Sequence, residues 1–199
     1  HRAPWRLYAL ANLASLILLL SHPWVLEPYL SSDTQGALWR GLLGCYGLAG
    51  FVVATRPMAT QQPLSPMGPT QESTTTPGWL WALLAGAASA LLMATTEALA
   101  RDMASSPLLW VAPLAVFLAS IIITFDRPQL YRRGPIMSAM GLAMIALAAA
   151  ASFAEAVPFM LGAGAHLAVL AAGATLCHGE LYHARPAPSE LTRYHLSMA

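Results

Sequence analysis

The chain has little charge and no lysine. Only 10% of its 199 residues are charged and 57% are hydrophobic, whereas an ordinary soluble domain carries about 25% charged residues. All ten basic residues are arginines, and nine acidic residues nearly balance them. The sequence shows no basic patch with interleaved aromatic residues, which excludes a nucleic-acid-binding surface of the usual kind. This composition is typical of a membrane protein.

Cysteines and catalytic motifs are also scarce. Cys45 and Cys177 are the two cysteines, which excludes a disulfide framework and any zinc or iron–sulfur site built from cysteine alone. The sequence contains no G-x-S-x-G, no H-E-x-x-H, no P-loop and no dinucleotide-binding glycine fingerprint. Because no complete catalytic constellation remains, we expect no catalytic residue in this chain.

Long apolar segments are what the sequence has instead. A membrane span needs about 20 mostly apolar residues, and we predict an all-α polytopic membrane protein with about six spans in one transmembrane domain, residues 1–199. The predicted spans lie near residues 5–20, 36–55, 78–100, 107–125, 136–153 and 158–176. Pro158 separates the last two spans into a helical hairpin, because proline removes a backbone donor and clashes with the preceding turn.

Two segments are predicted to lie outside the spans. Residues 56–77 are rich in Pro, Ser, Thr and Gln and nearly uncharged, which predicts a flexible cytoplasmic loop. Residues 184–199 are expected to form a C-terminal tail that is truncated in this chain.

The arginines predict the orientation. With six spans both termini lie on one side of the membrane, and eight of the ten arginines fall on that side: Arg2, Arg6, Arg56, Arg127, Arg132, Arg133, Arg185 and Arg193. Arg40 and Arg101 fall on the other side. Since cytoplasmic loops carry the excess of positive residues, we expect both termini to be cytoplasmic.

Small residues are concentrated in the second and sixth spans. Glycine recurs at positions 41, 44, 47 and 50, and the sixth span contains the segment GAGAHLAVLAAGA. Small residues let helices approach closely in a membrane. Helix packing is the main interpretation, and a groove that accommodates a ligand is the alternative.

A polar cluster is predicted at the non-cytoplasmic end of the third span. It consists of Thr95, Thr96, Glu97, Arg101 and Asp102. Glu97 and Arg101 are four residues apart, so they share a helix face and can pair. One interpretation is an interfacial ion pair with threonines bonded to backbone carbonyls; the other is a polar mouth for a cationic or hydroxylated ligand.

His166 is the only histidine in the middle of a predicted span, with Gly162 one turn before it. That glycine would allow a flat macrocycle to approach the imidazole, so His166 is a candidate tetrapyrrole ligand. A second mid-membrane histidine for two-histidine haem ligation does not exist. A hydrogen-bonded core histidine is therefore the main interpretation, and we predict no cofactor other than bound lipid.

The end of the sixth span carries four weak candidates for metal binding, namely Cys177, His178, Glu180 and His183. These side-chain types all bind metals, but Cys177 and His178 are adjacent and point in different directions on a helix. We therefore predict no metal site. Gly179 is expected to mark the point where the helix ends.

Several strings resemble a known family. TTEALARDMASSPLLWVAPLAVFL, FDRP, YRR and CHGELYHARPAPSELTRYHLSMA, together with ALANLASLILLLSHPWVLEP near the start, look like the membrane portion of bacterial spermidine-synthase-like proteins. The chain carries Glu97 where that family usually has an amide side chain. The resemblance implies a multi-pass protein of the bacterial inner membrane, and it places any aminopropyltransferase-type domain beyond residue 199.

Three functions follow as hypotheses. The first is a non-catalytic membrane domain of a spermidine-synthase-like protein, acting as an anchor or scaffold. The second is an accessory subunit that packs against partner helices in a larger respiratory or photosynthetic complex. The third is a small-solute transporter that uses the Thr95–Asp102 cluster as a gate. The lipid bilayer is the partner common to all three.

Overall fold

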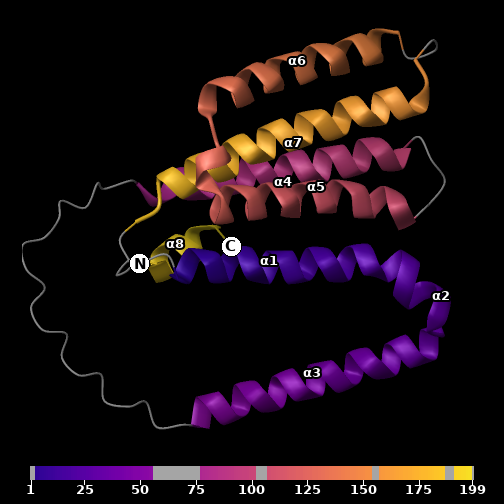
Figure 1. The fold of residues 1–199 in the computed structure, drawn as a ribbon, viewed down its shortest axis with the longest axis vertical. Helices are drawn as coiled ribbons and strands as arrows, with labels where there is room; N and C mark the ends of the chain where they lie inside the picture. Colours follow the sequence, from indigo (N-terminus) through magenta and orange to yellow (C-terminus); the bar gives the residue numbers. More distant parts are fainter. Residues whose placement is uncertain (1–2, 56–76, 102–106, 154–156, 187–190, 199) are drawn as a thin grey trace, which may run out of the picture. The chain divides into compact units, whose positions relative to one another are not determined.

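The computed structural model describes residues 3–55, 77–101, 107–153, 157–186 and 191–198. Within these ranges every regular element is a helix, as predicted (Figure 1). Residues 56–76 of the predicted loop lie outside the described residues. Six long helices occupy the positions of the predicted spans: α1 (Ala3–Ser21), α3 (Ser32–Thr55), α4 (Gly78–Arg101), α5 (Pro107–Asp126), α6 (Arg133–Ser152) and α7 (Phe159–His183).

Four segments of the described chain are both long and apolar enough to cross a membrane: Tyr8–Tyr29, Gly78–Arg101, Arg133–Ser152 and Phe159–His183. In α5 the apolar segment Trp110–Asp126 is shorter, and Pro113 lies inside it. The helix α3, which has Asp33 and Arg40 in its first half, is not among the four. The chain is therefore a helical membrane protein with at least four candidate spans.

The chain divides into two compact units, residues 1–20 with 74–199, and residues 21–73. The smaller unit begins with a π-helix, η1 (His22–Leu26), followed by the short α2 (Glu27–Tyr29) and by α3. Pro23 lies in this π-helix. Proline has no backbone N–H and disturbs α-helical hydrogen bonding, and the wider π-turn occurs at this point in the chain. Ser31 then caps α3, because its Oγ accepts a hydrogen bond from the Thr34 N–H at 3.3 Å.

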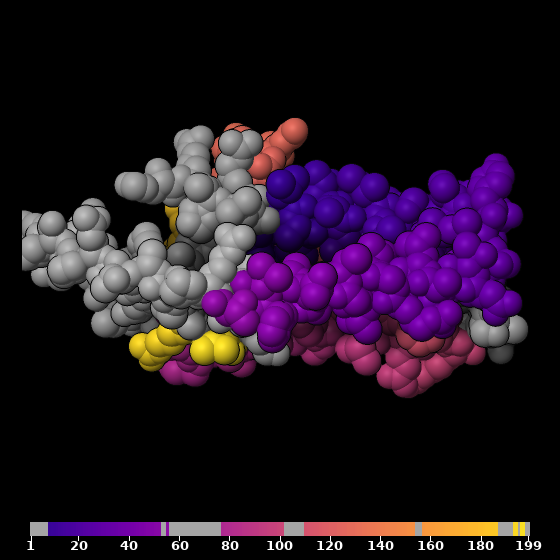
Figure 2. Space-filling view, turned by 90° about the horizontal axis from the view of Figure 1, so that it is seen from below, coloured from indigo at the N-terminus to yellow at the C-terminus, as the bar shows by residue number. Residues whose placement is uncertain are grey.

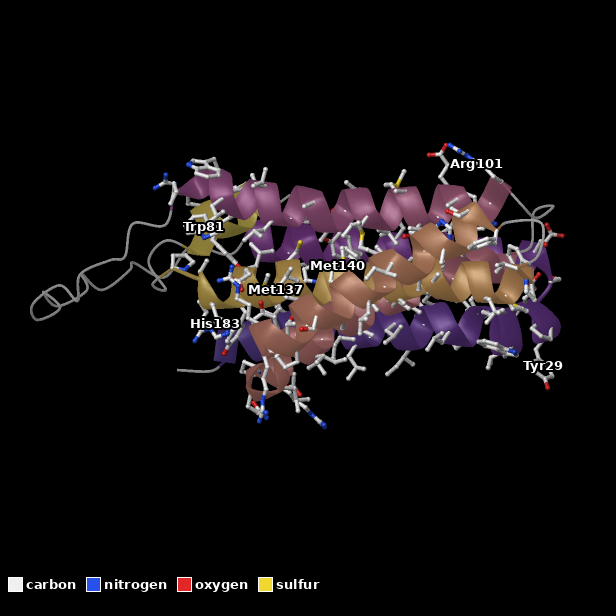
Figure 3. The ribbon with its side chains drawn as sticks, turned by 90° about the horizontal axis from the view of Figure 1, so that it is seen from above. Tyr29, Trp81, Arg101, Met137, Met140 and His183 are labelled. Atoms are coloured by element: carbon white, nitrogen blue, oxygen red, sulfur yellow. The ribbon has the colours of Figure 1, made fainter. Side chains whose placement is uncertain are left out.

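In the larger unit, α7 is the central helix and packs against α4, α5 and α6. Its buried positions include Ala165, Val169, Leu170 and Ala174. Gly173 brings α7 close to its neighbours, since a Cβ there would meet Leu91 of α4 and Met140 of α6. Figure 3 shows Met140 on α6 where that helix passes α7. Lipid supplies no hydrophobic driving force for helix association, and small residues such as Gly173 allow the helices to pack closely instead.

The N-terminal helix α1 joins this unit through a small apolar cluster. Ala9 is buried with Ile121 and Phe125 of α5, and the Tyr8 ring meets Phe125 edge-on with centroids 5.0 Å apart. The contact places the start of α1 beside the end of α5.

The C-terminal part of the fold corrects one expectation. Gly179 does not end the helix, because α7 continues to His183. A Cβ at Gly179 would overlap the ring of Tyr131, which follows the 3-10 helix η2 (Pro128–Leu130). The glycine therefore allows a close approach instead of a helix exit. The predicted tail contains a further helix, α8 (Leu191–Met198), which packs on α4.

Candidate functional site

One end of the larger unit holds a hydrogen-bonded polar cluster. Tyr131 donates its hydroxyl proton to Glu180 Oε1 at 2.6 Å, and Arg133 Nε lies 3.6 Å from the same oxygen. Burial raises the pKa of the Tyr131 phenol, and the hydrogen bond to the Glu180 carboxylate raises it further. We call this end, which carries Arg127, Arg132, Arg133 and Arg185, the arginine-rich end. The Glu180 carboxylate therefore has two partners, Tyr131 and Arg133.

Two residues before Glu180, His178 of α7 forms a buried pair with Ser120 of α5. Ser120 Oγ lies 2.8 Å from His178 Nδ1, and the two residues are 3% and 5% exposed. The Ser120 hydroxyl also donates to the Phe117 carbonyl at 2.6 Å, so its oxygen accepts from His178 Nδ1–H. A serine nucleophile needs the opposite arrangement, in which the imidazole accepts the hydroxyl proton. The pair orients the core and does not activate Ser120.

The same end holds α8 in place with two aromatic side chains. Trp81 Nε1 donates to the Ala184 carbonyl at 2.9 Å, and the Tyr194 hydroxyl donates to the Leu181 carbonyl at 3.0 Å. The two rings meet edge-on with centroids 5.1 Å apart. Since Trp81, Tyr194 and Leu181 are all buried, α8 is fixed to both α4 and α7.

The predicted polar cluster lies at the opposite end of α4, where Figure 3 shows Arg101. The predicted ion pair forms, with Arg101 Nη2 2.6 Å from Glu97 Oε1, and both side chains are largely exposed. Thr96 Oγ1 donates to the Leu92 carbonyl at 2.8 Å, and Thr95 is buried. Asp102 lies outside the described residues. An exposed pair four residues apart on a helix contributes about 0.3–0.5 kcal/mol, so it supports the interfacial interpretation.

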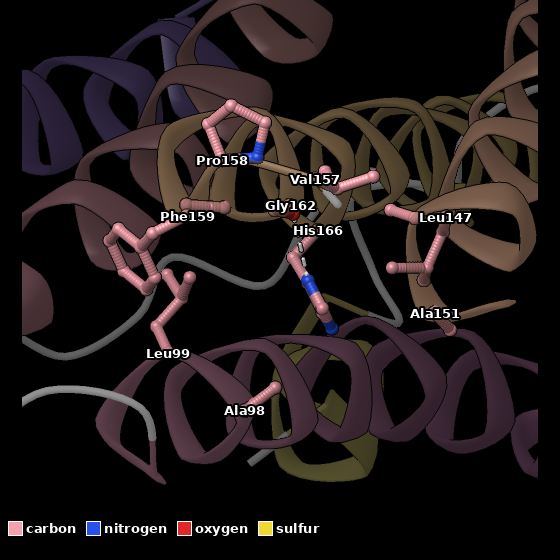
Figure 4. A pocket seen from close by; sticks show the side chains of 11 residues that line it. Ala98, Leu99, Leu147, Ala151, Val157, Pro158, Phe159, Gly162 and His166 are labelled. Atoms are coloured by element: carbon pink, nitrogen blue, oxygen red, sulfur yellow. Dashed lines mark hydrogen bonds between the residues drawn. The ribbon is translucent and has the colours of Figure 1, made fainter. Parts of the chain in front are cut away.

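Beside that cluster a crevice of about 570 Å³ opens between α4, α6 and α7. Its walls are mostly apolar and include His166, whose ring lies between the helices in Figure 4. The crevice is lined by Ala98, Leu99, Leu147, Ala150, Ala151, Val157, Pro158, Phe159, Gly162, Ala163 and His166. His166 is thus a predicted site residue that the structure places at a cavity.

The imidazole of His166 has a defined orientation. Its Nδ1 lies 3.0 Å from the Gly162 carbonyl oxygen, one turn earlier in α7. Because a carbonyl oxygen only accepts, Nδ1 carries the proton and donates it. In the neutral ring Nε2 therefore keeps its lone pair.

The four weak metal candidates do not converge. The described residues contain no group of three or more His, Cys, Asp or Glu side chains that could hold a metal ion. His178 faces Ser120 in the core, Glu180 faces Tyr131, and the His183 ring lies 5.5 Å from that of Tyr131. His178 therefore faces a different neighbour from Glu180 and His183, which both contact Tyr131.

Sequence reasoning missed the partners Ser120, Tyr131, Trp81 and Tyr194. For Ser120, Tyr131 and Trp81, the hydrogen-bond partner is at least 49 positions away in the sequence. The partner of Tyr194 is Leu181, which lies beyond the expected end of the sixth span. The sequence feature that could have indicated these contacts is Gly179, since a glycine inside a long helix often marks a close approach.

Comparisons of the chain with protein families, curated proteins and solved structures gave no match.

Proposed function

We propose that the chain is the non-catalytic membrane domain of a spermidine-synthase-like protein in the bacterial inner membrane, where it acts as an anchor and scaffold. In this proposal α1, α3, α4, α5, α6 and α7 all span the bilayer, and both termini are cytoplasmic. The observation that carries it is the outward-facing apolar surface of the long helices.

That surface has the distribution expected of lipid contact. Large side chains point outward, including Leu142 and Ile145 on α6, both 68% exposed, and Met160 on α7, which is 78% exposed. The helix interfaces instead contain small residues such as Ala174 and Gly173. Water would disfavour so much exposed apolar area, whereas a bilayer favours it.

The anchoring role is supported by the way α8 is held. Tyr194 is completely buried and bonded to α7, and Trp81 bonds to the residue that follows α7. A segment attached after α8 would therefore leave the membrane domain from a fixed point. The resemblance implies a further glycine-rich membrane segment and then an aminopropyltransferase-type domain beyond residue 199.

The orientation is supported by the arginine-rich end. Arg127, Arg132, Arg133 and Arg185 lie at the end where α5 and α7 finish, and Arg101 lies at the other end of the unit. Since positive residues favour the cytoplasmic side, this end faces the cytoplasm in the proposal. Fusions of green fluorescent protein and of alkaline phosphatase after residue 199 test it: fluorescence with inactive phosphatase is expected, and the reverse pattern contradicts the orientation.

The number of spans can be tested with a native cysteine. Cys45 is exposed near the middle of α3, and a thiol inside the bilayer does not form the reactive thiolate. In a Cys177→Ala background in intact membranes, a membrane-impermeant maleimide should leave Cys45 unlabelled and should label Ser32→Cys at the start of α3. Ready labelling of Cys45 would show that α3 does not span.

The anchor proposal has its own test. A soluble reporter fused after residue 199 should sediment with membranes and resist an alkaline carbonate wash. The native polypeptide should also have an intact mass well above the 21.1 kDa of these residues. A native mass close to that value would count against an attached domain.

A second candidate, an accessory subunit of a larger membrane complex, is favoured by α3. A Cβ at Gly41, Gly44, Gly47 or Gly50 would meet nothing within 4 Å, and Figure 2 shows the atoms of α3 in violet. Small residues at that spacing fit a partner helix. Co-purification at a fixed stoichiometry through detergent exchange would support this role, and a monodisperse monomer would remove it.

A further inference from the structure

The crevice around His166 has the size of a ligand site. Small-molecule sites typically enclose about 300–1,000 Å³ and combine apolar walls with few polar groups. Here the walls include Ala98 of α4, Ala150 and Ala151 of α6 and Ala163 of α7. These short side chains keep the space between the three helices open. The crevice is separate from the polar network at the arginine-rich end.

The side chain of His166 presents a hydrogen-bond acceptor to the crevice. His166 Nδ1–H is held by the Gly162 carbonyl, which leaves the Nε2 lone pair, and Figure 4 shows the ring between Ala98 and Ala151. A ligand that offers only carbonyl oxygens would place a lone pair against this lone pair. A ligand with a hydroxyl group would donate to it.

We propose that this crevice binds a membrane-dissolved molecule with an apolar body and a phenolic hydroxyl head group, which donates a hydrogen bond to His166 Nε2. The apolar walls favour the body of such a molecule, and among the described residues that line the crevice none has a charged side chain to hold an ionic head group. A bilayer supplies ligands of this class directly from the lipid phase. The same lone pair could serve as the axial ligand of a metal tetrapyrrole, which the test below distinguishes.

The test uses a matched pair of ligands on the full chain in lipid nanodiscs. A 4-alkylphenol carries the hydroxyl donor, and the corresponding 4-alkylanisole has the same shape without it. A net hydrogen bond is worth about 1 kcal/mol, so the phenol should bind roughly fivefold more tightly than the anisole. Equal affinity for the two ligands would overturn the proposal.

Two pairs of variants locate the site. His166→Phe keeps a ring of similar size and removes the lone pair, so the preference for phenol should disappear. Gly162→Leu should block the crevice and abolish binding of both ligands. Its control is Gly164→Leu on the same helix: a Cβ meets nothing within 4 Å at either glycine, but Gly164 does not line the crevice. Unchanged binding in Gly162→Leu would place the ligand elsewhere and refute the site.

Two further measurements bear on the mechanism. In ¹⁵N spectra of the ligand-free protein, His166 should show a protonated Nδ1 and an unprotonated Nε2; the opposite tautomer would refute the acceptor assignment. Zinc protoporphyrin should not bind through His166. A zinc protoporphyrin complex that His166→Phe abolishes, in a protein that does not bind the phenol, would replace this proposal with a tetrapyrrole site.

Discussion

Gly179→Ala should destabilise the fold, although alanine is the better helix former. The added Cβ would overlap the Tyr131 ring, and the ring is held because its hydroxyl bonds to Glu180 on the same turn of α7. Overpacking costs about 1–3 kcal/mol, and loss of the hydrogen bond adds about 1 kcal/mol. The higher helix propensity of alanine offsets about 1 kcal/mol. The expected net loss is about 2 kcal/mol of unfolding free energy.

The chain offers a native reporter for this measurement. Cys177 is half-buried two residues before Gly179, so its reaction with a thiol dye during denaturation by sodium dodecyl sulfate follows the opening of α7. The experiment uses a Cys45→Ala background to remove the exposed thiol. Gly164→Ala is the matched control, because its Cβ enters open space and should leave stability unchanged or slightly raised.

Gly173→Ala provides an intermediate case. Its Cβ would meet Leu91 Cδ1 at 2.5 Å and Met140 Cε at 3.4 Å, and both atoms are the ends of flexible side chains. We expect a smaller loss than at Gly179. A Tyr131→Ala background should remove most of the cost of Gly179→Ala, since the two residues are in direct contact. If Gly179→Ala matches Gly164→Ala, or if its cost persists without the Tyr131 ring, the close-approach explanation is wrong.

Three other predictions concern the same end of the fold. Tyr194→Phe should cost about 1 kcal/mol and increase proteolysis of α8, and Trp81→Phe should act similarly, both measured by limited digestion. The pKa of Tyr131 in the folded protein lies above its unfolded value near 10. Its contribution to the free energy of unfolding is therefore complete below about pH 10 and is lost as pH rises further. Near-UV circular dichroism should show that the fold of Tyr131→Phe is less sensitive to alkali than that of the wild type. Ser120→Ala should lower the free energy of unfolding by about 1–3 kcal/mol, measured by thermal unfolding, because it leaves His178 Nδ1 unpaired. The double variant with His178→Phe should recover part of that loss.

Much of the helical layout could be predicted from the sequence. The apolar segments place all six long helices, and the boundary at Gly78 agrees with the start of α4. Helix ends that depend on packing were predicted less well. The apolar segment of α7 stops near Leu176, but the helix continues to His183 because Tyr131, Trp81 and α8 pack against its polar last turns. Hydropathy does not report such contacts.

The candidate sites show the same division. The Glu97–Arg101 pair could be predicted because both partners lie on one helix, four residues apart. The Ser120–His178 pair could not, since the partners lie 58 residues apart and meet only when α5 packs on α7. His166 was recognised as unusual from its position, but its tautomer depends on a side-chain rotamer that directs Nδ1 to Gly162.

Small residues explain why the two ends of α7 differ in what they can do. At Gly173 and Gly179 the space that a side chain would occupy is filled by atoms of neighbouring residues, so each glycine allows close packing. At Gly162 nothing lies within 4 Å of the Cβ position, and the glycine leaves space beside His166. The sequence shows the same residue type in all three cases. One end of α7 is consequently a tightly packed attachment point for α8, and the other is open enough to admit a ligand.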